Sequence, residues 1–246
     1  AARGLHEVQK HHGMDAVAGY TGNPSAHNLT ALLSLPPVLR SLKTRNLFSA
    51  STVDQYPQML AAYLVFGAQL SIPVADLDRT SFLMILGANP LVSNGSLMTA
   101  PGMKRRIREI RERGGRVVVL DPRRTETAEA ASEHLFLRPG TDAPFVLAML
   151  SVLFEEGLVR LGACEGRVTG LDDVKAAVRA WTPERVEAIT GVSAADTRRL
   201  AREMATAEGA GCYNRIGTCV QPYGTLASWL VDVLNVVSGN LDRPGG

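Results

Sequence analysis

The alternation of short apolar runs with helical patterns in the middle of the chain constrains the fold most strongly. Residues 81–86 read Ser-Phe-Leu-Met-Ile-Leu, residues 116–120 read Arg-Val-Val-Val-Leu, and residues 134–138 read His-Leu-Phe-Leu-Arg. Runs of this length are typical of strands that are buried on both faces of a sheet. Helical patterns at about 102–113, 127–132 and 145–156 separate and follow these runs. We therefore predict an α/β fold with a parallel sheet flanked by helices.

The remaining segments are less regular. Helical patterns at about 5–18, 28–42 and 58–70, and a strand pattern at about 46–53, precede the middle region. Pro36 and Pro37 are expected to break or kink the second of these helices. After the middle region we expect helices at about 171–181, 183–190, 193–208 and 223–237, and a strand at about 211–216.

The charge balance argues against a nucleic-acid partner. The formal net charge is +2, and 20% of the residues are charged while 46% are hydrophobic, as in ordinary globular proteins. The basic stretch from Lys104 to Arg113 is interrupted by Glu109 and Glu112, so either a solvated helix face or an anion-attracting face fits it. No apolar run reaches the roughly 18–20 residues that a bilayer requires, so we expect no membrane span.

The three cysteines, Cys164, Cys212 and Cys219, form no CxxC pair. This scattered, odd set argues for a reducing compartment and against a disulfide framework or a zinc or iron–sulfur knot, so the expected location is cytoplasmic. His11-His12 suggests a metal site, but adjacent histidines on a helix point in different directions, which favours solvent exposure.

Candidate binding residues follow the first two predicted strands. In open parallel sheets, ligands bind at the carboxyl ends of the strands. Gly87 lets a backbone approach a phosphate closely, and Asn89 offers an amide donor. Asp121 is placed to accept hydrogen bonds from ribose hydroxyls, and Arg123 and Arg124 are able to pair with phosphates.

The loop after the third strand leads to Asp142, whose carboxylate matches the adjacent amide and amino N–H groups of a guanine edge. Each candidate also has a purely structural interpretation. Gly87 would make a tight turn, Asp121-Pro122 would end a strand, and Asp142 would be the N-cap of the next helix. Three such loops on one sheet edge favour binding.

Two common nucleotide-binding motifs are absent from the sequence. GxGxxG does not occur, and the spacing from Gly87 to Asp121 exceeds the roughly 20 residues expected after such a motif. A P-loop, GxxxxGK[ST], does not occur either. A standard NAD site and a P-loop are therefore disfavoured.

An ordered set of motifs resembles the molybdopterin oxidoreductases, the family that includes formate dehydrogenases, periplasmic nitrate reductases and dimethyl sulfoxide reductases. The motifs are GNP at 22–24, GANP at 87–90, DPRRTETA at 121–128, RPGTD at 138–142 and SGNLDRPGG at 238–246. Together they span nearly the whole chain in the family's order, and an ordered set is far more specific than any one motif.

The resemblance implies a bis(molybdopterin guanine dinucleotide) cofactor that holds molybdenum or tungsten through dithiolene sulfurs. The residues that match the family's cofactor-binding positions are, near phosphate or pterin, Gly87, Asn89 and Ser93; near ribose and phosphate, Asp121, Arg123 and Arg124; and around guanine, Gly140 and Asp142. The resemblance also places residues 217–224 near the pterin, where Val220-Gln221 stands in place of the family's usual Gln-His pair.

The resemblance further implies a longer parent protein. Family members usually carry an amino-terminal CxxCxxxC segment for a [4Fe–4S] cluster and a carboxy-terminal domain that completes the second guanine dinucleotide site, and this sequence has neither. We therefore expect an internal fragment, inactive by itself, with the iron–sulfur cluster in the missing amino-terminal part. Residues 1–77 would begin an outer α/β lobe, residues 78–205 would form an inserted Rossmann-like cofactor-binding unit, and residues 206–246 would return to the outer lobe.

The sequence identifies no catalytic residue and no protein ligand to the metal. Many family members place a Cys, selenocysteine or Ser before the GxNP loop, but residues 49–57 contain no Cys. Asp54 or Ser51 would then be an oxygen ligand, although Asp54 also fits as a helix cap. Cys219 is the one cysteine with an approach to the pterin loop, although a small buried hydrophobe fits it as well.

Three hypotheses follow. The leading one is the cofactor-binding core of a molybdenum or tungsten oxidoreductase, formate dehydrogenase-like in its specific form. Its partners would be a small-molecule redox substrate, an electron-transfer partner and the remaining domains of the parent chain. The second is a structural subunit that resembles the large iron–sulfur subunit of NADH dehydrogenase and lacks the molybdenum cofactor. The third is an unrelated nucleotide-binding α/β module.

Overall fold

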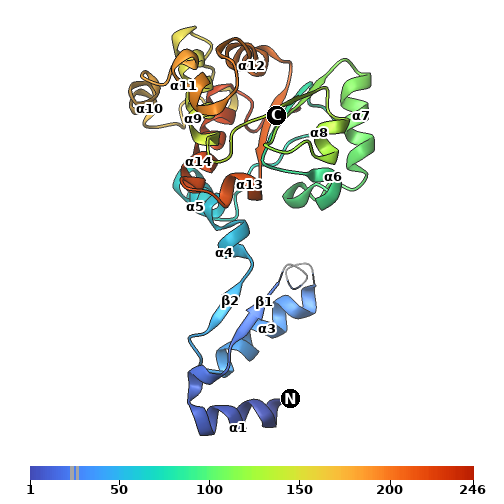
Figure 1. Ribbon diagram of the computed structural model, residues 1–246, viewed down its shortest axis with the longest axis vertical. Coiled ribbons are helices and arrows are strands. Elements are labelled where there is room, and N and C mark those ends of the chain that lie inside the picture. Colours follow the sequence, from blue (N-terminus) through green and yellow to red (C-terminus); the bar gives the residue numbers. More distant parts are fainter. Residues whose placement is uncertain (23–24, 26–27) are drawn as a thin grey trace. The chain divides into compact units, whose positions relative to one another are not determined.

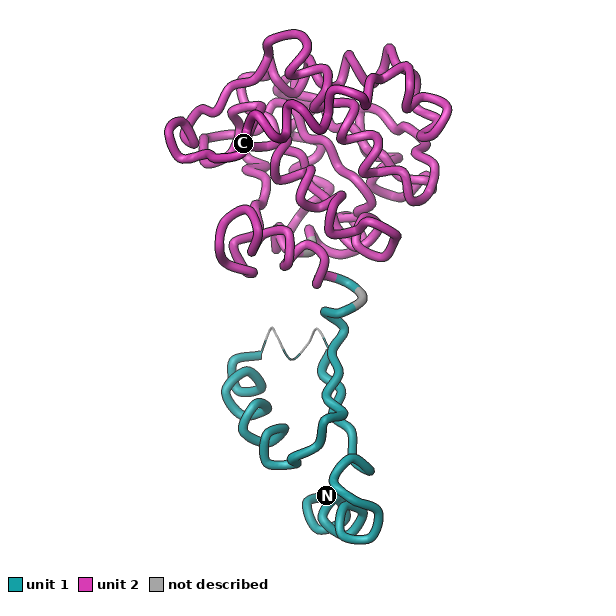
Figure 2. Tube along the Cα trace, turned by 90° about the vertical axis from the view of Figure 1, so that its left-hand side faces the viewer, with its two compact units in different colours: residues 1–54 teal, residues 55–246 magenta. Residues whose placement is uncertain are grey.

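The computed structural model describes residues 1–22, 25 and 28–246, so Asn23 and Pro24 of the GNP motif lie outside the described residues. The chain divides into two compact units, residues 1–54 and residues 55–246 (Figure 2). The domain boundaries expected for the whole protein, at residues 77/78 and 205/206, stay a prediction.

Unit 1 contains a parallel pair of short strands in which Gly19 pairs with Leu47 and Thr21 with Ser49. Its elements are α1 (Ala2–His12), the 3-10 helix η1 (Met14–Ala16), β1 (Gly19–Thr21), α3 (Leu29–Ser41), β2 (Leu47–Ser49) and α4 (Ser51–Asp54). The strand predicted at 46–53 is therefore shorter than expected, and its second half is helical.

Pro36 and Pro37 were expected to break or kink their helix, and α3 runs through both of them without a break. Asn28 is the N-cap of the helix, and its side chain accepts a hydrogen bond from the Ala31 N–H at 3.0 Å. Arg40 Nε donates to the Pro36 carbonyl at 3.2 Å. Each proline removes one N–H donor, but the helix continues on both sides of the pair.

Unit 2 is built around a four-stranded sheet in the order β5-β4-β3-β6, and all of its strand pairs are parallel. The strands are β3 (Phe82–Leu86), β4 (Arg116–Leu120), β5 (Glu133–Leu135) and β6 (Ala210–Asn214). Helices flank the sheet, which confirms the predicted α/β class.

The helices of unit 2 connect and cover these strands. They are α5 (Tyr56–Phe66), α6 (Pro90–Ser93), η2 (Ser96–Met98), α7 (Met103–Glu112), α8 (Glu126–Ala130), α9 (Asp142–Glu155), η3 (Gly162–Cys164), α10 (Leu171–Val178), α11 (Pro183–Thr190), α12 (Ala194–Thr206), α13 (Ile216–Cys219) and α14 (Gly224–Val237). No helix in the described part of the chain is both long enough and apolar enough to cross a membrane.

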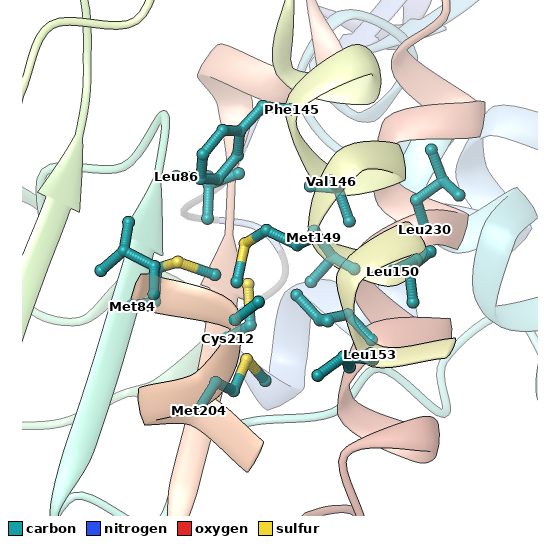
Figure 3. Close-up of a cluster of buried hydrophobic side chains, with 14 of the residues drawn as sticks. Met84, Leu86, Phe145, Val146, Met149, Leu150, Leu153, Met204, Cys212 and Leu230 are labelled. Carbon is teal, nitrogen blue, oxygen red and sulfur yellow. The ribbon is translucent and has the colours of Figure 1, made fainter. Parts of the chain in front are cut away.

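The core of unit 2 lies on both faces of the sheet, because successive strand residues point to opposite faces. Met84 and Leu86 contact one buried cluster, which includes residues of α9, α12 and α14 (Figure 3). Leu83 and Ile85 contact a second cluster that includes residues of α7. Figure 1 shows α7 and α8 on one side of the sheet, with α9, α12 and α14 on the other. The apolar runs in the sequence reflect this double coverage.

The outer edge of β6 is closed by side-chain amides. Asn235 Nδ2 donates to the Cys212 carbonyl at 2.9 Å, and Asn235 Oδ1 accepts from the Cys212 N–H at 2.9 Å. Asn240 Oδ1 accepts from the Ala210 N–H at 3.1 Å. Gln58 Nε2 donates to the carbonyl of Asn214 at 3.3 Å. These amides take the place of a neighbouring strand, so the edge offers few free backbone groups to another chain.

Candidate functional site

The carboxyl ends of the parallel strands of unit 2 lie at one edge of the sheet. The loops after β3, β4 and β5 contain or directly precede the predicted cofactor-binding residues, except Ser93, which is the last residue of the short helix α6. The segment after β6 adds residues 215–223. The structure therefore brings together side chains that are far apart in the sequence. How these loops are fixed decides what they are able to bind.

The loops after β3 and β6 touch through two glycines. Gly87 has φ +54°, and its carbonyl accepts a hydrogen bond from the Gly217 N–H at 2.9 Å. A Cβ atom on Gly87 would lie 2.9 Å from the Gly217 backbone, and one on Gly217 would lie 2.7 Å from the Gly87 Cα atom. Both positions therefore require glycine, because two backbones pass each other here.

Replacing Gly87 by alanine is expected to lower the free energy of unfolding by about 2 kcal/mol. The added methyl group would meet the backbone of Gly217 at 2.9 Å, and the variant would also have to adopt the φ of +54°. Gly114→Ala is the matched control, because Gly114 has φ +85° with nothing within 4 Å of an added Cβ. Gly114→Ala should lower the free energy of unfolding by about 1 kcal/mol, because only the backbone strain of a positive φ opposes it. Denaturant unfolding measures both variants, and equal losses would contradict the steric argument.

Asn89 joins the loops after β3 and β4. Its Nδ2 donates to Glu126 Oε2 at 2.8 Å, and its Oδ1 accepts from Thr127 Oγ1 at 2.7 Å. Ser93 Oγ donates to the Asn89 carbonyl at 3.3 Å. The amide of Asn89 is thus bonded within the protein, and it fixes the loop after β3 to the segment after β4.

Asp121 organises the turn that follows β4. Its Oδ1 accepts from the Arg123 N–H at 2.8 Å, and a ring nitrogen of His134 lies 2.9 Å from its carbonyl oxygen. Arg123 and Arg124 are exposed. Arg123 lies 3.9 Å from Glu126, a distance at which an exposed ion pair contributes little. Both guanidinium groups are therefore accessible to an anion.

Asp142 is the first residue of α9, and the N-cap is Thr141, so the interpretation of Asp142 as the N-cap is wrong. Its side chain turns instead to the loop after β6, where Gln221 Nε2 donates to its Oδ2 at 2.7 Å. Asp142 is only 7% exposed. Burial raises the pKa of Asp142 above its ordinary value, and the nearby charge of Asp121 raises it further.

Sequence reasoning placed Gln221 near the pterin but missed its contact with Asp142, and it missed Thr127 and His134 as members of this edge. Gln221 is 79 positions from Asp142 in the chain, and no motif links the two. Thr127 stands inside the DPRRTETA motif, but its contact with Asn89 depends on the order of the strands. His134 was assigned only to the strand itself.

No group of three or more His, Cys, Asp or Glu side chains arranged to hold a metal occurs among the described residues. Ser51 and Asp54 lie on α4 in unit 1, whereas Cys219 belongs to α13 in unit 2. Cys219 is 5% exposed, and burial raises the pKa of its thiol, which disfavours the thiolate form that metals bind.

A family model described as molybdopterin oxidoreductase matches residues 1–245. The chain belongs to the molybdopterin oxidoreductase family. The match includes the strand-end loops of unit 2 and all of unit 1, so the resemblance drawn from the motifs is confirmed.

Relatives of this molybdopterin oxidoreductase chain carry the names of enzymes. Formate dehydrogenase H from Escherichia coli is 27% identical over 244 residues, which cover 99% of this chain and 33% of the relative. The assimilatory nitrate reductase catalytic subunit from Bacillus subtilis is 26% identical, over 96% of this chain and 33% of the relative. The chain spans about a third of the length of the curated relatives it matches.

The fold is also that of a solved structure, acetylene hydratase from Pelobacter acetylenicus. The TM-score is 0.77 and the sequences are 23% identical, over 98% of this chain and 32% of the other. This likeness supports the α/β architecture described above and carries no conclusion about chemistry.

Proposed function

We propose that the strand-end loops of unit 2 bind the guanosine end of molybdopterin guanine dinucleotide, and that the chain is the cofactor-binding core of a larger molybdenum or tungsten oxidoreductase. Formate dehydrogenase H, among the relatives, favours a formate dehydrogenase-like enzyme. The redox substrate, the electron-transfer partner, the other domains with their iron–sulfur cluster, and the cytoplasmic location belong to the same proposal.

The observation that carries this proposal is the buried carboxylate of Asp142 at the sheet edge. Among the described residues, the only side chain that donates a hydrogen bond to it is Gln221, which is neutral. Burial without a cationic partner is costly for a carboxylate, and the nearby negative charge of Asp121 raises that cost for Asp142. A guanine edge presents two neighbouring N–H donors, which a carboxylate accepts as a pair.

The other loops fit the rest of the nucleotide. Arg123 and Arg124 are exposed next to the turn of Asp121, where phosphate groups would meet two guanidinium groups. Gly140 has φ +79° and leaves open backbone beside Asp142. When bound, the cofactor supplies the metal at which electrons are exchanged with the substrate, and these residues hold and orient its nucleotide end.

Titration calorimetry of the chain with GDP and ADP tests the proposal. GDP should bind about tenfold or more tightly than ADP, because a good bidentate pair to a base edge contributes about 1–3 kcal/mol. Asp142→Ala should remove this preference. Both affinities are expected to be low, because the chain spans a third of its relatives' length.

Asp172→Ala is the matched control, because Asp172 is also a first-turn carboxylate, on α10, and is exposed. It should leave the GDP preference intact. Equal binding of GDP and ADP by the unchanged chain would contradict a guanine site. The structural-subunit hypothesis would then be favoured.

A further inference from the structure

The carboxamide of Gln221 lies next to Asp142 and Gly140, the two residues assigned to the guanine base. Its Nε2 donates to Asp142 Oδ2 at 2.7 Å. Its Oε1 lies 3.7 Å from where a Cβ atom of Gly140 would stand. The resemblance places residues 217–224 near the pterin, and it does not account for a contact of Gln221 with the residues assigned to the base.

The contact joins two segments that are far apart in the sequence. Gln221 follows β6 and Asp142 follows β5, and these strands are the two edges of the order β5-β4-β3-β6. Asp142 is the first residue of α9, and Phe145 on the same turn of α9 belongs to the buried cluster of Leu86, the last residue of β3. The contact therefore joins the loop after β6 to the start of α9, at the carboxyl edge of the sheet where the nucleotide is proposed to bind.

The chemistry of a carboxamide resembles that of a guanine edge. Both present an N–H donor next to a carbonyl oxygen, and a carboxylate accepts from either. Gln221 is held in this pose from its own side as well, because Nε2 lies 3.3 Å from the Gly217 carbonyl oxygen. The carboxamide thus supplies a donor to one oxygen of Asp142, as a guanine edge would.

We propose that Gln221 is a stand-in for the guanine base: its carboxamide occupies the base position on Gly140 and Asp142, and a guanine nucleotide binds by displacing it. This inference rests on the proposed function. It makes Gln221 a residue that sets the affinity and base preference of the site. A purine without adjacent donors for Asp142 gains little by displacing Gln221, so the competition lowers the affinity for guanine nucleotides more than the affinity for adenine nucleotides.

The test compares GDP binding by the unchanged chain, Gln221→Ala and Gln221→Met. Methionine keeps the length of the side chain and removes both amide groups. Both variants should bind GDP about threefold to tenfold more tightly, since a net hydrogen bond of this kind no longer has to be broken. ADP affinity should change less. Leu226→Ala, on α14 just after this loop and 41% exposed in the native chain, is the matched control and should bind GDP as the unchanged chain does.

A second readout follows the side chain directly. In proton–nitrogen NMR spectra, the Gln221 side-chain amide signals should move on addition of GDP and stay in place with ADP. Thermal unfolding of each variant confirms that it is folded before titration.

The outcomes separate the two proposals. If the unchanged chain prefers GDP but the Gln221 variants bind GDP equally or more weakly, the stand-in is overturned while the guanine site remains. If neither the unchanged chain nor the variants distinguish GDP from ADP, the guanine site itself is wrong, and the stand-in fails with it.

Discussion

Replacing Asn235 by alanine is expected to lower the free energy of unfolding by about 4 kcal/mol. Asn235 is 6% exposed and makes paired hydrogen bonds of 2.9 Å with the N–H and the carbonyl of Cys212. The variant leaves both backbone groups without their partner, and a buried unsatisfied group costs about 1–3 kcal/mol. The loss of the carboxamide from a packed position adds to this cost. Denaturant unfolding monitored by circular dichroism measures the change.

Leu226→Ala is the matched control, because Leu226 lies on the same helix, α14, and is 41% exposed. It should change the free energy of unfolding by less than about 1 kcal/mol. A loss of that small size for Asn235→Ala would contradict the edge-closing role. It would mean that water from the adjoining cavity of about 580 Å³, which Cys212 and Asn235 line, replaces the amide.

The same amides show where sequence reasoning reaches its limit. The runs at 81–86 and 116–120 could be assigned to strands because an unbroken apolar run between Gly, Pro and Asp has few other structures open to it. That β6 joins the sheet beside β3, at an edge, depends on packing between distant segments. Asn240 belongs to the SGNLDRPGG motif, yet its contact with the Ala210 N–H becomes visible only once β6 is known to be an edge strand.

The candidate site divides in a similar way. Gly87, Asn89, Asp121 and Asp142 could be placed at one edge from the sequence, because parallel strands end their loops on the same side. Their partners could not be predicted. Asn89 offers an amide donor as expected, but the structure directs that donor to Glu126. The spacing of apolar residues in the sequence predicts the helices and strands. The choice among hydrogen-bond partners depends on distances between side chains, which are set only when the chain is packed.

A second buried group, Asp232 on α14, stands apart from this site and sets an expected pH dependence. Asp232 is 4% exposed, and its Oδ2 has no hydrogen-bond partner among the described residues. Burial raises the pKa of Asp232 to about 7. The ordinary value for an aspartate is about 4. The folded chain therefore holds this proton more tightly than the unfolded chain does.

The sign of the effect follows from that difference. The stability contributed by protonated Asp232 is fully present below about pH 4 and is lost as the pH rises through about 7. Asp232→Asn removes this titration, because an amide stays neutral. The stability of the variant relative to the unchanged chain should therefore be about 3 kcal/mol greater at pH 8 than at pH 5. Urea unfolding at the two pH values gives both differences.

Comparing variant with unchanged chain at each pH cancels the contributions of other groups, such as Asp142, whose pKa is also raised by burial. Asp172→Asn is the matched control, because Asp172 is exposed and should give the same difference at pH 5 as at pH 8. If Asp232→Asn stabilised the chain equally at both pH values, packing of the amide would be the cause. A stabilisation that grows by about 3 kcal/mol from pH 5 to pH 8 requires that the folded chain holds the proton of Asp232 more tightly than the unfolded chain does.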